Sequence, residues 1–252
     1  MSEGNLLGKV AIITGSARNM GRAFADSLAA RGADIAIHHH GSTSRSDAEE
    51  TARLVRAQGR KAVIVSGDLS KSVNVHGAFD AAFAAFGRVD ILINAAGLVL
   101  KKPLIEVTEE DYDRSFGANA KAAFLMMQQA ARRISDLGRI INIGTTLLGA
   151  TTASYSVYAG SKAPLEHFTR ALAQEIGSRG VTVNTIAPGP VDTPFYHGQE
   201  TAESAANAAR RVPAQRLGRI TDIVPLVEFL ASAQSQWITA QTIFINGGYV
   251  SR

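Results

Sequence analysis

The fold is decided by one stretch near the N-terminus, Lys9-Val10-Ala11-Ile12-Ile13-Thr14-Gly15-Ser16-Ala17-Arg18-Asn19-Met20-Gly21. Its first six residues are mainly apolar and β-branched, which predicts a buried strand. A glycine-bearing turn follows, and Arg22–Gly32 then has the apolar spacing of a helix that ends at a glycine. In such a unit, backbone N–H groups and the helix dipole point at an anion, so the stretch predicts a phosphate cradle. A plain tight turn is the alternative, because a Gly-rich turn alone is only moderately specific.

The rest of the chain repeats this alternation of strand and helix. Further strands are expected at residues 33–38, 62–70 with the exit turn, 89–97, 139–145, 181–187 and 241–248. Helices are expected at residues 47–58, 73–86, 108–133 (one or two helices), 158–172 and 221–230. The pattern predicts an α/β fold, a single Rossmann-type doubly wound parallel sheet with helices on both faces. One domain built on the phosphate cradle should span residues 1–252, with a substrate lid at 194–216.

Composition limits the class of protein. The chain has 252 residues, a net charge of +4 and no cysteine, which excludes disulfides and thiolate metal sites and suits a cytoplasmic protein. Lys and Arg are scattered, so a solvated surface is favoured over a nucleic-acid patch. Residues 1–5 lack the basic and apolar segments of a secretory signal. No apolar run approaches the ~20 residues that span a bilayer, so no membrane association is expected.

The end of the second predicted strand bears on the choice of cofactor. In nucleotide-binding βαβ units, an acidic residue there binds the ribose hydroxyls of NAD. This strand ends in His38-His39-His40 instead, which leaves no carboxylate to repel a 2′-phosphate, and Arg18 could bind that phosphate. The sequence therefore predicts NADP(H), with NAD(H) as the alternative. A metal site at the histidines is disfavoured, because consecutive residues of a strand face opposite ways.

Tyr158 and Lys162 are the candidate catalytic pair. Helical spacing should place them on one face, one turn apart, with a kink or a late helix start at Pro164. A phenol titrates near ~10, and a neighbouring ammonium group lowers that pKa, so the tyrosine could act as a general acid or base. The alternative is an ordinary surface pair.

With these residues in place, the whole chain resembles the short-chain dehydrogenase/reductase family. The resemblance rests on motifs in the family's order: Thr14-Gly15 through Gly21, Asp68, Asn94-Ala95-Ala96-Gly97, Asn119, Thr145, Tyr158 through Lys162, Pro188-Gly189 and Gly247-Gly248. The general likeness is to bacterial β-ketoacyl carrier-protein reductases and to sugar or polyol dehydrogenases. It implies a homotetramer, with contacts through the C-terminal strand and through the helix of Phe168, Leu172 and Ile176.

The resemblance also implies residue roles. Tyr158 would exchange the proton with a ketone or secondary alcohol, Lys162 would lower its pKa, Thr145 would bind the substrate oxygen, and Asn119 would hold a water linked to Lys162. The implied cofactor-binding residues are Gly15, Ala17, Arg18, Asn19, Met20, Gly21, His39, Ser42, Asp68, Leu69, Asn94, Ala95, Ala96, Gly97, Tyr158, Lys162, Pro188, Gly189, Val191 and Thr193.

Three positions depart from the family's pattern. Asn19 replaces the middle glycine of the turn, Thr145 replaces a serine, and Ala240 stands where glycine is frequent, a change expected to matter little. The resulting hypothesis is an oxidoreductase that transfers a hydride between NADP(H) and a ketone or secondary alcohol. A non-catalytic NADP(H)-binding regulatory protein is the alternative. His197, Arg210 and Arg211 could meet an acidic substrate, although solvated charge is the favoured interpretation.

Overall fold

Seven strands form one all-parallel sheet in the computed structural model, which describes residues 6–251. They are β1 (Val10–Thr14), β2 (Asp34–His39), β3 (Ala62–Ser66), β4 (Ile91–Asn94), β5 (Arg139–Ile143), β6 (Thr182–Pro188) and β7 (Thr242–Ile245). The order β3-β2-β1-β4-β5-β6-β7 grows outward from β1 in one direction and then in the other. A crevice opens at such a reversal, beyond the carboxyl ends of the strands. The predicted fold class is confirmed.

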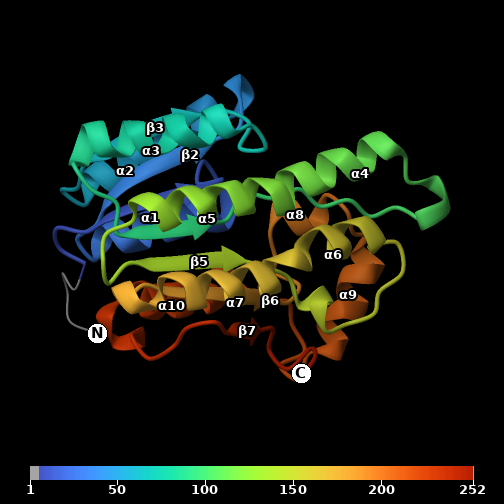
Figure 1. The fold of residues 1–252 in the computed structure, drawn as a ribbon. Helices are drawn as coiled ribbons and strands as arrows, with labels where there is room; N and C mark the ends of the chain where they lie inside the picture. The colour runs from blue at the N-terminus through green and yellow to red at the C-terminus, as the bar shows by residue number, and fades with distance from the viewer. Residues whose placement is uncertain (1–5, 252) are drawn as a thin grey trace.

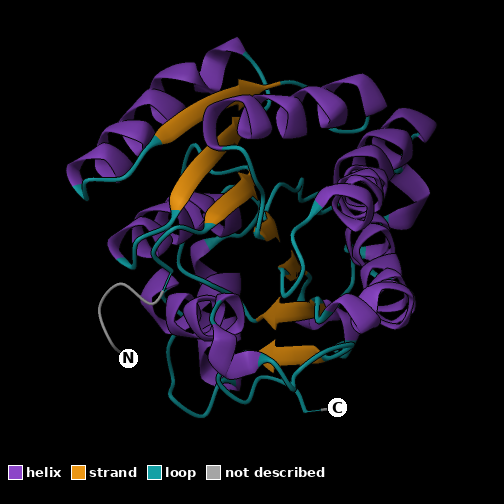
Figure 2. Ribbon diagram, turned by 60° about the vertical axis from the view of Figure 1, so that its left-hand side comes forward, coloured by secondary structure: helices purple, strands orange, loops and turns teal. Residues whose placement is uncertain are grey.

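Helices cover both faces of the sheet (Figures 1 and 2). One layer contains α1 (Asn19–Ala30), α2 (Arg45–Ala57) and α10 (Ile220–Ala231), and the other contains α3 (Ser72–Phe86), α5 (Ala122–Arg133) and α7 (Pro164–Ile176). Side chains of β1 alternate between them: Ala11 and Ile13 join the first core and Ile12 joins the second. Because both faces are buried, this strand is apolar throughout.

The remaining elements lie mainly beyond the carboxyl edge of the sheet. Figure 1 shows α4, α6, α8 and α9 on the side to which the arrow of β5 points. These helices are α4 (Glu109–Phe116), α6 (Ser156–Lys162), α8 (Pro194–His197) and α9 (Ala202–Arg211). Short turns are η1 (Ser42–Ser44), η2 (Leu104–Glu106), the π-helical η3 (Gly117–Lys121), η4 (Thr146–Leu148), η5 (Gly177–Arg179) and η6 (Ala233–Ser235).

Local sequence signals explain several helix boundaries. Thr108 and Asp111 form a capping box at the start of α4. Pro164 interrupts the hydrogen bonding between α6 and α7, as expected, while Ala163 keeps helical angles, so the two helices continue one another. Asp68 lies just before α3 without capping it: its carboxylate accepts the N–H of Ser70, and α3 begins after Lys71.

Two left-handed residues show how departures from glycine are accommodated. Asn19 has φ 51°, which asparagine adopts more readily than most residues, so the turn keeps its shape. Ala240 has φ 62°, although it was expected to matter little. An alanine in this region carries a strain of roughly 1 kcal/mol or more, which explains a preference for glycine at the position.

The surface of α7 differs from the expectation. Leu172 and Ile176 are buried against the sheet core, so they cannot supply the predicted contact surface. Their helix is amphipathic, and its apolar stripe faces inward. Phe168 is half-buried and packs against Phe124, whose side chain is 42% exposed. Trp237, between η6 and β7, is 99% exposed.

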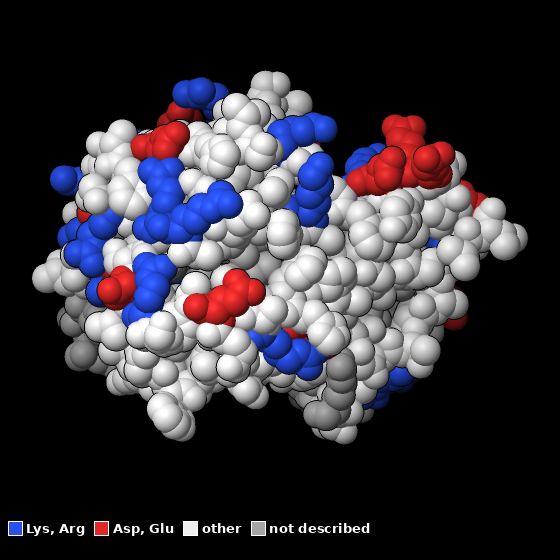
Figure 3. All heavy atoms as spheres, in the orientation of Figure 1, with Lys and Arg blue, Asp and Glu red and all other residues white. Residues whose placement is uncertain are grey.

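Charges are mixed on the face drawn in Figure 3. Lys and Arg are interspersed with Asp and Glu, and acidic side chains gather over α4, whose first turn contains Glu109, Glu110 and Asp111. Within residues 6–251, no helix has the length and apolar character to cross a membrane. The prediction of no secretory signal concerns residues 1–5, which lie outside the described part of the chain.

Candidate active site

A cavity of about 1100 Å³ occupies the carboxyl edge of the sheet. It runs from the turn after β1 and the ends of β2 and β3, past the ends of β4, β5 and β6, to α8, α9 and the residue Tyr249. The predicted catalytic residues Thr145, Tyr158 and Lys162 line it. So do all the predicted cofactor residues except Ser42 and Asn94.

Glycine is required at two positions of the turn after β1. A Cβ on Gly15 would lie 2.8 Å from the Cα of Ala96, and one on Gly21 would lie 2.3 Å from the carbonyl oxygen of Gly15. Gly15 also has φ 64°. The turn is therefore packed tightly under α1, with Ala17, Arg18, Asn19 and Met20 along the cavity. This close packing fits a dinucleotide whose pyrophosphate approaches the backbone.

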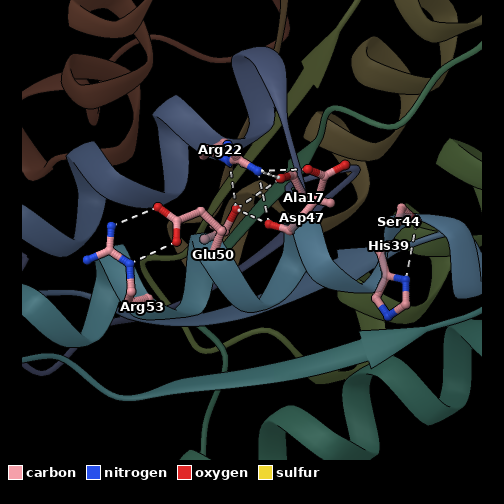
Figure 4. Close-up of polar contacts among 8 residues, drawn as sticks. Ala17, Arg22, His39, Ser44, Asp47, Glu50 and Arg53 are labelled. Carbon is pink, nitrogen blue, oxygen red and sulfur yellow. Dashed lines mark hydrogen bonds and ion pairs between the residues drawn. The ribbon is translucent and has the colours of Figure 1, made fainter.

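Arg22 holds this turn from behind (Figure 4). Its guanidinium donates to the carbonyl oxygen of Ala17 at 2.6 Å and to the backbone oxygen of Asp47 at 3.0 Å. Thr51 donates to the same Ala17 oxygen at 3.1 Å. These bonds satisfy a carbonyl at the start of α1 and fix the turn against α2, although sequence reasoning assigned Arg22 no role.

His38 links the turn after β1 to the turn after β3. Its Nδ1 lies 3.1 Å from the N–H of Gly15, and its Nε2 lies 2.9 Å from the carbonyl oxygen of Gly67. A carbonyl only accepts, so Nε2 donates and Nδ1 accepts, which requires the neutral ring. Burial lowers the pKa of His38 to about 4, so the ring stays neutral at physiological pH. The sequence analysis considered this histidine for metal binding and as part of a strand end without a carboxylate, but not as a link between two turns.

The end of β2 places His39 on the cavity and Ser42 away from it. His39 Nδ1 lies 2.9 Å from the carbonyl oxygen of Gly41, with Ser44 beside it (Figure 4). The 3₁₀ turn leaves Ser42 exposed and turns Ser44 inward, so Ser44 lines the cavity where Ser42 was predicted. Arg18 is exposed at this end of the cavity, and no carboxylate of residues 6–251 pairs with it.

The ends of β3 and β4 contribute backbone and small side chains. Asp68 and Leu69 line the cavity, as do Ala95, Ala96 and Gly97. Asn94 does not, because its side chain donates to Asn142 on the neighbouring strand at 2.8 Å. The register of β4 and β5 pairs these two residues directly and turns the amide into the sheet. The Asn94 side chain therefore faces the neighbouring strand, and a place for Asn94 to Gly97 beside the ribose stays a prediction.

Tyr158 and Thr145 form the reactive end of the site. The phenol hydrogen-bonds with the Thr145 side chain, which lowers its pKa, but burial acts more strongly and raises the pKa of Tyr158 to about 12. The sequence predicted a pKa lowered by Lys162. That prediction is wrong for this structure, because desolvation of the phenolate outweighs the other contributions. Tyr158 is therefore protonated at neutral pH.

Lys162 is directed to the end of β5. Its Nζ donates to the carbonyl oxygen of Ile143 at 2.8 Å, and burial lowers its pKa to about 8. Asn119 lies nearby: a Cβ on Gly97 would meet Asn119 Oδ1 at 2.9 Å and Lys162 Nζ at 3.2 Å. Both amine and amide therefore crowd one glycine, where a larger residue would displace them.

Asn119 does not line the cavity. Its amide accepts from the N–H of Leu98 at 2.9 Å and donates to the oxygen of Leu98 at 2.8 Å and to Ser161 at 2.9 Å. The π-helical turn η3 supplies this position, and such turns are frequent at functional sites. The side chain thus ties α6 to the loop after β4. Its expected link to a water stays a prediction.

The predicted lid segment closes the far end. Glu200 accepts from Lys101 at 2.6 Å and from the hydroxyl groups of Tyr155 and Ser204. The ring of Tyr155 lies edge-on to that of Tyr158, with centroids 6.0 Å apart. Sequence reasoning missed Lys101, Tyr155 and Glu200. The one available signal was a second tyrosine three residues before Tyr158.

A family model described as enoyl-(acyl carrier protein) reductase matches residues 15–250. A short-chain type dehydrogenase/reductase of Picea abies is 37% identical over 253 residues, which cover 96% of this chain and 93% of that protein. The chain belongs to the short-chain dehydrogenase/reductase family. The fold and the order of the motifs described above agree with this assignment, and membership makes the chain an NAD(P)-dependent oxidoreductase.

Two solved structures are similar to this short-chain dehydrogenase/reductase over nearly its full length. A Burkholderia cenocepacia protein with bound NADP has a TM-score of 0.95 and 42% identity, covering 100% of this chain and 97% of that one. A blue fluorescent protein from a metagenomic library, in complex with NADPH, has a TM-score of 0.93 and 36% identity, covering 98% and 100%.

Proposed function

We propose that the protein is an NADP(H)-dependent reductase that converts a ketone to a secondary alcohol. The observation that carries this proposal is the convergence of the Tyr158 phenol, the Thr145 hydroxyl and the buried Lys162 ammonium at one end of a cavity built on the turn after β1. The similar structures with NADP and NADPH support the cofactor, as does the cationic Arg18 beside a strand end without a carboxylate.

The residues of this chain have separate tasks in the reaction. The turn after β1, from Gly15 to Gly21, would hold NADPH, which would supply the hydride for the carbonyl carbon. Thr145 holds the carbonyl oxygen, and Tyr158 gives its proton to that oxygen as the alcohol forms. The Lys162 ammonium stabilises the phenolate left behind. Burial raises the pKa of Tyr158 to about 12, so the phenol carries its proton at neutral pH and can act as the donor.

Replacing Tyr158 tests the chemistry. Tyr158→Phe removes the proton donor but keeps the ring, so we expect ketone reduction to fall by 10²-fold or more, roughly the contribution of general acid catalysis, while NADPH still binds. Consumption of NADPH at 340 nm and a calorimetric titration measure the two effects. Tyr112→Phe, on the exposed face of α4, is the matched control. Near-normal turnover by Tyr158→Phe refutes the mechanism, and NADPH binding by the parent without turnover of any ketone favours a regulatory protein.

We also propose a homotetramer. The exposed Phe124 on α5, packed against the half-buried Phe168 on α7, supports one contact surface. The sheet edge at β7 with the exposed Trp237 supports a second. From composition alone we propose a cytoplasmic location. Cell fractionation followed by immunodetection of the protein would test it.

A further inference from the structure

Among residues 6–251, one cationic side chain at the substrate end of the cavity has neither a carboxylate partner nor a role assigned above. Its walls include the cationic residues Arg18, Lys101, Arg114, Lys162 and Arg211. Lys101 pairs with Glu200 at 2.6 Å, and Arg114 pairs with Asp111 at 3.2 Å. Lys162 is assigned to the catalytic step and Arg18 to the cofactor end. Arg211 has no carboxylate partner within residues 6–251.

Arg211 is held in place by an aromatic ring. Its guanidinium lies over the ring of Tyr249, 4.6 Å from the centroid, and both residues line the cavity. A guanidinium that lies over an aromatic ring interacts with it through its flat face. The N–H groups at its edge can then still bind an anion. Tyr155, Phe195 and Tyr196 line the same end and offer apolar surface to the body of a substrate.

Comparison with nearby basic residues indicates that Arg211 does more than stabilise the end of α9. Arg210 and Arg211 both lie in the last turn of α9, where positive charge favours the helix dipole. Arg210 donates to Asn207 and does not line the cavity. His197, the third residue considered for an acidic substrate, pairs with Asp192 at 2.7 Å. Of these three residues, Arg211 alone lines the cavity.

We propose that Arg211 binds a carboxylate of the substrate, so that the enzyme acts on ketones that carry an acidic group at a distance from the carbonyl. The inference rests on the proposed function and names its substrate class. One guanidinium presents two parallel N–H donors and one positive charge, which match a carboxylate in shape and charge. Glu200 does not repel the acid, because Lys101 neutralises it.

The test compares ketones that differ only in charge. We would use 4-acetylbenzoate and 5-oxohexanoate with their methyl esters, and measure kcat/KM with NADPH. For the parent enzyme we expect the acids to exceed the esters by roughly 10- to 100-fold, the range of a charge-assisted hydrogen-bonded pair. Arg211→Ala should lose that factor for the acids and leave the esters unchanged. Arg211→Lys should restore part of it.

Arg210→Ala is the matched control, with the same charge removed one residue away, and it should leave all four substrates unchanged. The proposal is overturned if the esters equal the acids in the parent enzyme, if Arg211→Ala slows acids and esters equally, or if Arg210→Ala has the same effect. Calorimetric binding of the acids to the NADPH complex provides a second measurement. If no compound is reduced, the proposed function fails, whereas binding of the acids that Arg211→Ala abolishes still supports the site.

Discussion

Lys162 places an ammonium group where water is largely excluded. Its residue surface is 4% exposed, and one carbonyl oxygen, that of Ile143, accepts its hydrogen bond at 2.8 Å. Burial lowers its pKa from 10.5 to about 8. The charged lysine is therefore less favourable in the folded protein than in the unfolded chain, and it costs stability below pH 8. The proposed function explains why a destabilising charge is kept there: the ammonium group stabilises the Tyr158 phenolate formed in the reaction.

The stability of the protein should depend on pH through Lys162. A difference of 2.5 pKa units, from 10.5 to about 8, corresponds to about 3 kcal/mol. Lys162→Met should therefore abolish turnover yet raise the free energy of unfolding at pH 7, by up to about 3 kcal/mol. Between pH 8 and 10.5 the folded lysine loses its proton before the unfolded one does, so the advantage of methionine should shrink. Urea unfolding at pH 7 and pH 10 measures this, and a variant less stable than the parent at pH 7 contradicts it.

Arg18 should set the preference for NADPH over NADH. Its guanidinium is exposed at the cofactor end, with no carboxylate partner among the described residues, so it is free to bind a 2′-phosphate. Arg18→Ala should raise the KM for NADPH by roughly 10- to 100-fold and leave the KM for NADH nearly unchanged. Arg53→Ala, which breaks an exposed pair with Glu50 on α2, is the control. A parent enzyme with higher kcat/KM for NADH would show that the cofactor assignment is wrong.

Among the helices and loops, the proposed lid segment meets two other segments of the chain at the carboxylate of Glu200. Glu200 precedes α9, Lys101 lies in the loop after β4, and Tyr155 precedes α6. The backbone N–H of Lys101 also donates to Gln199 at 3.0 Å. Three segments that are distant in sequence therefore meet over the substrate end, beside the ring of Tyr158.

Glu200→Gln tests this attachment. The amide cannot neutralise Lys101, so the closed position of the lid should lose roughly 1–3 kcal/mol of stabilisation. We expect KM for the ketone to rise by roughly tenfold, the binding of NADPH to persist, and amide exchange to accelerate within residues 194–211. Glu203→Gln, an exposed carboxylate in the first turn of α9, is the control and should change none of these. Unchanged exchange in Glu200→Gln argues against the attachment.

Periodicity made most of these elements predictable. β1, α1 and the cradle follow from apolar runs, glycine and helical spacing, and their bounds differ from expectation by a few residues. What failed depended on tertiary neighbours. The apolar stripe of α7 was visible in the sequence, but the sequence did not show whether the sheet or solvent faces it. The side chain of Asn94 could not be assigned to the sheet without the register of β5. Likewise, Glu200 and Lys101 are about a hundred residues apart, and no local pattern connects them.

For the whole molecule, the exposed Phe124 beside the half-buried Phe168 predicts assembly. Phe124→Glu would place a charge in an apolar contact between copies, which is strongly unfavourable when buried without a partner. The parent should show about four times the chain mass of 26.6 kDa in light scattering, and Phe124→Glu should show a smaller species. Val73→Glu, at a 71% exposed position on α3, should not change the mass. A monomeric parent contradicts the prediction.

The sequence contains a single tryptophan, and Trp237 is 99% exposed beside the edge strand β7. All indole emission of this protein therefore comes from one site that water surrounds in the isolated chain. Covering that site with a second copy would shift the emission to shorter wavelength and hide it from iodide or acrylamide. A dilution series read in a fluorimeter would then report subunit separation without any label, at concentrations too low for scattering.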